Sequence, residues 1–241
     1  MEFNSANKAY KITALEGFRT FIQGERAGHT FIFEPFSPLR TKHNHGADIE
    51  ENKALPQRNM YIGKSEVQIQ EIDFNHKFET NISYFILPEE KFGAFVRRTS
   101  LTNIDPVPVT FSFLDGLAQI EPYGGKLNYL LKNMGRTLEA WFGVYQVYND
   151  TLAFPFYRFT SKPADTANVI VEKQGHYCFS FVDGFNYSLN PIVYDTSKIF
   201  GEDTSLLQPL VLFEKSISEI VSGPQYGRAK TASAFAAGRN I

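Results

Sequence analysis

Two stretches of this sequence place polar residues at spacings that could support chemistry. The first is His43-Asn44-His45, with Asp48 and Glu50 close behind it. Two histidines at i and i+2 point the same way on a strand and could share a metal ion. The surrounding stretch Arg40–Arg58 is polar, however, and is predicted to be a solvated loop, which collects such residue types by chance. We therefore assign no metal site, and the sequence indicates no cofactor.

The second stretch leaves an apolar run at Asp115, turns at glycines and ends at a predicted helix. Polar side chains on a loop held between rigid elements are a common way to build a sugar site. The candidate carbohydrate-binding or interface residues are Glu121, Tyr123, Lys126, Asn128, Lys132, Arg136 and Trp141. In the alternative interpretation the glycines only turn the chain. Trp141, the single tryptophan, would then pack in the core or against another subunit.

Other kinds of catalytic motif are absent from the sequence. It has no Walker loop, no Gly-x-Gly-x-x-Gly after a strand, no His-Glu-x-x-His and no Gly-x-Ser-x-Gly. The only cysteine, Cys178, stands in an apolar run, so a buried and inert thiol is predicted. A single cysteine also excludes zinc sites of the finger type. We therefore assign no catalytic residue.

Charge and hydropathy narrow the class of protein. The 241 residues carry a net charge of −2 and show no basic stripe of the kind that binds nucleic acid. The N-terminus lacks the basic and apolar regions of a signal peptide. No segment approaches the roughly 18 apolar residues of a membrane span. We expect a cytoplasmic protein that binds neither nucleic acid nor membrane.

The aromatic content favours β-structure, because aromatic side chains suit a half-buried pleated sheet. Aromatic residues make up 15% of the chain, with 23 Phe and 12 Tyr. Alternation and turn residues predict strands at Lys11–Ile22, His29–Phe33, Tyr61–Ile72, Ser83–Leu87, Phe92–Thr102, Val107–Leu114, Thr137–Tyr148, Phe154–Thr160, Asn168–Glu172 and Tyr177–Val182. No strand–helix alternation repeats, so we predict an all-β fold, a large antiparallel β-sandwich.

Two short helices and one domain complete the predicted organisation. Apolar residues recur at helical spacing in Lys126–Met134 and in Leu207–Val221. No stretch rich in Gly or Ser divides the chain, so residues 1–241 are predicted to form one domain. The small and polar residues 229–241 have no periodicity and are interpreted as the start of a linker.

Several short phrases occur in an order that resembles one enzyme family. They are Ser83–Glu90, Gly93–Arg98, Leu114–Leu117, Pro122–Gly124, Pro155–Arg158, Phe200–Ser205 and Ala232–Phe235. Together they resemble the N-terminal region of the 1,2-β-oligoglucan phosphorylases, relatives of cellobiose phosphorylase in glycoside hydrolase family 94. The resemblance spans about Ala14 to Phe235, and Arg40–Arg58 matches nothing in it. The phrases are structural more than catalytic.

The resemblance implies a fold and a role. These enzymes begin with an antiparallel supersandwich of the galactose mutarotase type, followed by a helical linker and an (α/α)6 barrel. The barrel holds the general acid and the phosphate site of an inverting reaction, in which phosphate attacks opposite the protonated leaving oxygen. The sandwich helps to form the homodimer. The resemblance therefore implies that residues 1–241 are the N-terminal part of a longer enzyme, a non-catalytic domain that supports dimer assembly and access of a β-glucan to a catalytic barrel.

Two other functions stay open. A stand-alone mutarotase or epimerase on the same fold would need a histidine and a carboxylate converging on a sugar ring oxygen. No histidine here lies in a phrase that matches such an enzyme. A plain sugar-binding or partner-binding module would need no catalytic residue at all.

Overall fold

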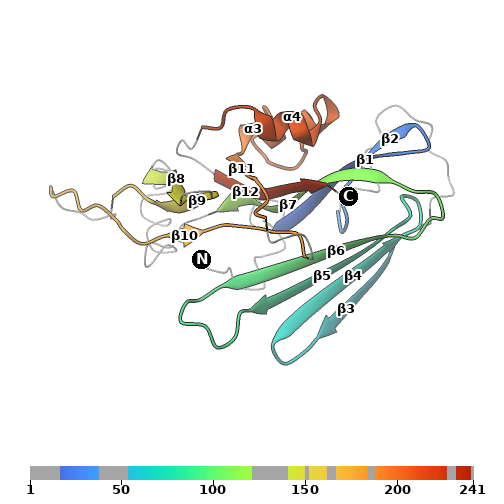
Figure 1. Cartoon of the computed structure of the whole chain (residues 1–241), viewed down its shortest axis with the longest axis horizontal. Coiled ribbons are helices and arrows are strands. Elements are labelled where there is room, and N and C mark those ends of the chain that lie inside the picture. The colour runs from blue at the N-terminus through green and yellow to red at the C-terminus, as the bar shows by residue number, and fades with distance from the viewer. Residues whose placement is uncertain are drawn as a thin grey trace. The chain divides into compact units, whose positions relative to one another are not determined.

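The computed structural model describes residues 17–37, 54–120, 141–149, 152–161, 167–183, 188–226 and 232–239. These residues are mostly strands in antiparallel sheets, with two short α-helices, so the predicted all-β fold is confirmed (Figure 1). The chain divides into two compact units. The first unit is Met1–Gln23 with Phe111–Ile241, and the second unit is Gly24–Thr110. One domain over residues 1–241 stays a prediction, because compact units can belong to a single domain.

A four-stranded meander forms most of the second unit. Its order is β3-β4-β5-β6, made by β3 (Gln57–Ile62), β4 (Glu66–Asp73), β5 (Phe78–Ile86) and β6 (Phe95–Asn103). The single strand predicted at Tyr61–Ile72 is therefore wrong. A turn at Gly63, whose N–H donates to the carbonyl of Glu66 at 2.9 Å, splits it into β3 and β4. The predicted alternation holds within β4, but the turn at Gly63 ends the preceding strand.

One face of this meander carries a hydrogen-bonded row of polar side chains. The Gln70 amide accepts from Asn59 at 2.8 Å and donates to Glu79 at 2.8 Å. Asn81 also donates to Glu79, at 2.8 Å. These hydrogen bonds, that of Asn81 first and that of Gln70 second, lower the pKa of Glu79. This row is the polar face that the alternation of β4 predicts.

The opposite face buries charge and aromatic rings at one end. The Glu71 carboxylate, in a residue only 1% exposed, accepts from Arg58 Nε at 2.7 Å and from the Phe36 N–H at 2.9 Å. Phe33, in β2 (His29–Phe33), stacks on Phe78 at 5.9 Å between ring centroids and on His76 at 4.5 Å. The strand predicted at His29–Phe33 is confirmed.

The first unit contains the strands β11 (Ile192–Asp195), β12 (Ala232–Arg239), β7 (Thr110–Ile120) and β1 (Phe18–Arg26), adjacent in that order. Residues 232–239, interpreted from the sequence as the start of a linker, instead form a strand paired with β11 and β7. Ser233 to Ala237 are all buried. This strand was not predicted from the sequence, because Ala and Ser differ little in hydropathy and produce only a weak alternation.

A second sheet packs on the first within this unit. Its order is β10-β9-β8, from β10 (His176–Tyr177), β9 (Leu152–Phe159) and β8 (Phe142–Asn149). Tyr157 of β9 shares a buried cluster with Ala234 and Ala236 of β12, and with Ile192. The Tyr157 hydroxyl donates to the carbonyl of Ser233 at 2.7 Å. Two β-layers therefore pack face to face here, as in a sandwich.

Short helical segments cover the other face of the first sheet. They are α3 (Ser197–Phe200), the 3₁₀ helix η3 (Leu210–Phe213) and α4 (Ile217–Ser222). The rings of Phe21, Phe200 and Phe235 meet at centroid distances of 5.5 to 6.2 Å. The Arg19 guanidinium lies over the Phe21 ring at 4.7 Å and donates to the Leu207 carbonyl at 2.8 Å. A β-strand arginine thus ties the helical segment to the sheet.

The helix predicted at Leu207–Val221 is two shorter helices. A capping box at Ser216 and Glu219 starts α4 afresh, so the helical path is interrupted after η3. Within the predicted helix, Phe213 is 65% exposed, whereas Leu212, Ile217 and Ile220 are buried. The helix predicted at Lys126–Met134 lies outside the described residues. Among the described residues, no helix is long and apolar enough to cross a membrane.

Other strand predictions differ from the structure in extent. β1 begins at Phe18, and residues 11–16 of the predicted Lys11–Ile22 strand lie outside the described residues. No strand forms at Asn168–Glu172, so that prediction is wrong. Of Tyr177–Val182, only Tyr177 belongs to a strand, and Phe181 makes an isolated bridge to Leu189. The sequence analysis missed β11. The remaining predicted strands match β5, β6, β7, β8 and β9 within several residues.

We expect Gly116→Ala to destabilise the first unit. A Cβ at Gly116 would lie 1.8 Å from the carbonyl oxygen of Ala234, and neither backbone can move without breaking the β7–β12 pairing. Overpacking against backbone should lower the free energy of unfolding by about 3 kcal/mol. Urea unfolding followed by circular dichroism measures it. Gly93→Ala is the control, because nothing lies within 4 Å of a Cβ there. Equal stability of the two variants would contradict the packing.

Candidate functional site

Most candidate residues from the sequence analysis lie outside the described residues. They are Glu121, Tyr123, Lys126, Asn128, Lys132 and Arg136, together with His43, His45, Asp48 and Glu50. Trp141 is described: it is half-buried, and its carbonyl accepts from the Thr160 N–H at 2.7 Å just before β8 begins. Trp141 is therefore the one candidate of this set that lies among the described residues.

A row of aromatic residues crosses the β10-β9-β8 sheet instead. Tyr145 pairs with Phe156, and Phe156 pairs with Tyr177, one residue from each strand. Because side chains alternate along a strand, this row faces away from the buried Tyr157. The Phe156 and Tyr177 rings lie 4.6 Å apart at 33°, and Phe154 meets Tyr177 edge-on at 5.5 Å. The outward face of the sheet is thus aromatic.

The two ends of this row differ. At one end the Arg158 guanidinium lies over the Tyr145 ring, 4.3 Å from its centroid. At the other end β10 is the last strand in the described order of the sheet, and Tyr177 is 57% exposed. Phe156 packs against one side of the Tyr177 ring. Tyr177 is therefore the ring of the row that is most open to a ligand.

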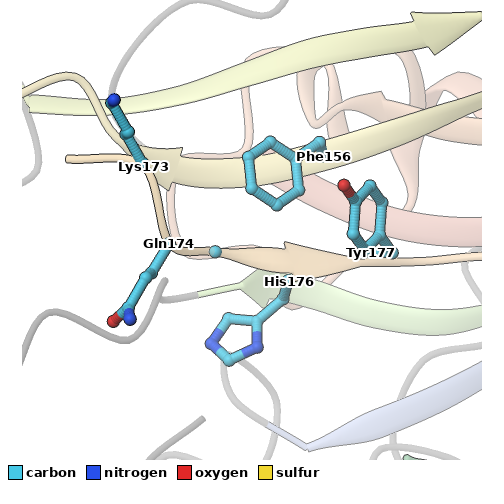
Figure 2. Close-up of a pocket in the computed structure, with 6 residues that line it drawn as sticks. Phe156, Lys173, Gln174, His176 and Tyr177 are labelled. Carbon is cyan, nitrogen blue, oxygen red and sulfur yellow. The ribbon is translucent and has the colours of Figure 1, made fainter. Parts of the chain in front are cut away.

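A hollow of about 440 Å³ lies beside Tyr177. We call it the edge aromatic site, and its lining residues are Phe156, Lys173, Gln174, Gly175, His176 and Tyr177 (Figure 2). Figure 2 shows the Lys173 amine on the same side of β10 as the two rings, whereas the Gln174 amide points to the side of His176. These groups donate hydrogen bonds, and the amide also accepts one. No carboxylate belongs to this lining, so the site offers apolar contact and hydrogen bonds.

Local hydrogen bonds hold the loop that carries the polar side chains. The Glu172 carboxylate accepts from the N–H groups of Lys173 and Gln174 at 2.8 and 2.9 Å. Arg158 donates to the Glu172 carbonyl. A Cβ at Gly175 would lie only 2.2 Å from the Tyr157 carbonyl oxygen, so glycine lets the loop lie directly against β9. The loop is therefore fixed to the same strand that carries Phe156.

Burial shifts the pKa of three groups near the site, His176, Cys178 and Tyr157, away from their usual values. Figure 2 shows the His176 imidazole on the opposite side of β10 from the two rings, and burial lowers its pKa to about 4. Burial raises the pKa of the half-buried Cys178 thiol to about 12, and a raised pKa is in keeping with the unreactive thiol that the sequence predicts. Burial also raises the pKa of Tyr157. None of these groups is poised as a nucleophile, because a reactive thiol needs a lowered pKa.

Comparison with known proteins adds no assignment. No family model matches the chain, and no curated protein matches its sequence. The resemblance to the phosphorylases therefore rests on the short phrases alone.

The edge aromatic site was not found from the sequence. Phe156 lies within the phrase Pro155–Arg158, and Tyr177 lies in an apolar run, but neither position signals a ligand by itself. Tyr145, Phe156 and Tyr177 meet only through cross-strand register, which local pattern does not reveal. The one local signal was Lys173-Gln174-Gly175, a polar turn between apolar stretches.

We expect His176→Gln to reduce the sensitivity of the fold to acid. The unfolded chain takes up the proton near pH 6.5, whereas the folded chain takes it up only near pH 4. The unfolded state thus binds more protons in this window, so stability falls as pH decreases from 6.5 to 4. The variant should lose less melting temperature across this range than the wild type. His29→Gln, at an exposed position of β2, is the control. An identical acid response of the His176 variant and the wild type would be inconsistent with this assignment.

Proposed function

We propose that this chain is a non-catalytic, carbohydrate-binding domain and that the edge aromatic site holds a sugar ring. The observation that carries the proposal is the exposed Tyr177 ring, packed on Phe156 and with the Lys173 amine on the same side of β10. A pyranose presents apolar C–H groups on the faces of its ring and hydroxyls around its rim. Ligand sites typically combine aromatic lining with a few polar groups that fix orientation.

We further propose the context of this binding. The ordered phrases support an N-terminal domain of an inverting glycoside phosphorylase, acting in the cytoplasm as part of a homodimer. Its role would be to guide a β-glucan toward an (α/α)6 catalytic barrel. The all-β fold and the two packed β-layers of the first unit are compatible with a galactose mutarotase-like supersandwich.

The mutarotase or epimerase alternative finds little support in the described residues. Among the described residues, His76 Nδ1 lies 3.0 Å from the Asp73 carboxylate oxygen Oδ1. That oxygen also accepts from the N–H groups of Asn75 and His76, at 3.0 and 2.6 Å. The carboxylate therefore closes the turn between β4 and β5. The edge aromatic site has His176 but no lining carboxylate.

We expect Tyr177→Ala to weaken glucan binding by about tenfold or more. Removing the ring removes the apolar surface on which the sugar would rest, and a loss of about 1.4 kcal/mol corresponds to tenfold in affinity. Isothermal titration calorimetry with β-1,2-gluco-oligosaccharides and cello-oligosaccharides measures it. Tyr226→Ala is the matched control, because Tyr226 is 68% exposed elsewhere in the first unit. Absence of binding by the wild type would refute the proposal.

We also expect no phosphorolysis by the chain itself. The motifs and titratable groups described above provide no general acid beside the edge aromatic site. The assay is phosphate-dependent release of glucose 1-phosphate from β-1,2-glucan, with a known phosphorylase as positive control. Turnover at enzymatic rates would contradict the non-catalytic role while leaving carbohydrate binding intact.

A further inference from the structure

Three consecutive β-branched residues lie exposed just before the edge aromatic site. Val169 is 81% exposed, Ile170 is 51% exposed and Val171 is 55% exposed. They belong to no strand, and within the described part of the chain they make no hydrogen bond. Their side chains favour a pleated sheet. A backbone with unpaired N–H and C=O groups and strand-forming side chains is a template for pairing with another strand.

The order of residues around Ile170 is self-complementary. In an antiparallel pair of two copies centred on Ile170, each Ile170 faces its counterpart and each Val169 faces a Val171. Asn168 then faces Glu172, so no two like charges are opposed. Antiparallel pairing centred on Glu172 would oppose two carboxylates, and parallel pairing in register would oppose both Glu172 and Lys173 with themselves. Like charges directly opposite are destabilising, so charge excludes these two arrangements. Antiparallel pairing centred on Val171 or Val169 would place Ile170 opposite Glu172 or Asn168, so only the register about Ile170 pairs all three apolar side chains with one another.

We propose that Asn168–Glu172 is a strand-addition site whose occupant is a second copy of this chain, paired antiparallel about Ile170. The pairing buries Val169, Ile170 and Val171 and satisfies their backbone groups. A twofold interface of this kind is isologous, because the same residues contribute from both copies. It forms at the segment next to the edge aromatic site and does not depend on sugar binding.

The register makes a sharp prediction for cysteine variants of the whole chain. Cβ atoms of directly opposed residues lie about 4.5–5.5 Å apart, near the separation that a disulfide spans. Ile170→Cys should therefore form a covalent dimer under mild oxidation. Val169→Cys alone should form much less, because it faces Val171, whereas a mixture of Val169→Cys with Val171→Cys should form the mixed dimer. The native Cys178 thiol is half-buried and its pKa is raised to about 12, so the wild type should remain uncrosslinked.

Sedimentation velocity over a concentration series tests the equilibrium. The wild type should associate to a dimer, and Ile170→Asp, which opposes two carboxylates, should raise its dissociation constant at least tenfold. Tyr226→Ala should leave association unchanged, and far-ultraviolet circular dichroism should show that the variants remain folded. A wild type that stays monomeric overturns the proposal. So does association that Ile170→Asp does not weaken, or crosslinking of Val169→Cys alone as efficient as that of Ile170→Cys. Loss of sugar binding in Tyr177→Ala with dimerisation intact would support the independence of the two sites.

Discussion

The close packing around β12 is the constraint on which the first unit depends. The side chains of Ala234 and Ala236 are short enough for Tyr157 of the second sheet to pack directly on them. The Tyr157 hydroxyl donates a hydrogen bond to the Ser233 carbonyl at 2.7 Å. On the opposite face Phe235 meets Phe21 and Phe200. Larger residues at the alanine positions would separate the two sheets, because protein interiors have little free volume. Within the first sheet, Gly116 permits a similarly close approach of β7 to β12, because it has no side chain.

The packing of Tyr157 against β12 also determines which side chains of β9 face outward. Once Tyr157 is fixed inward, the alternation of β9 turns Phe156 outward, where it pairs with Tyr145 and Tyr177. Gly175 rests against the Tyr157 backbone, so the loop with Lys173 and Gln174 is positioned by the same strand. The aromatic rings and the polar groups of the edge aromatic site therefore share one rigid support. A binding site on a rigid scaffold loses less conformational entropy when it meets a ligand.

Buried charges in the two units are satisfied by contacts inside each unit. Arg19, only 7% exposed, donates to backbone carbonyls of the loop after α3 and lies over aromatic rings. In the second unit, the Glu71 carboxylate accepts hydrogen bonds from Arg58 and from a backbone N–H. An unpaired buried charge would cost several kcal/mol, so these partners are required. They join segments distant in sequence, and no local pattern could have indicated them.

The sequence by itself determined the class of fold and the position of several strands, such as β2 and β6. It also separated the wet face of β4 from the apolar one, because residues two apart on a strand share a face whatever the tertiary context. It did not reveal β12, whose small residues carry little periodic signal, nor the division of the predicted helix at Ser216. Only the tertiary structure brought Tyr145, Phe156 and Tyr177 together and left Val169–Val171 outside any sheet. Strand register and exposure depend on contacts between residues far apart in the chain, and the spacing of neighbours does not encode them.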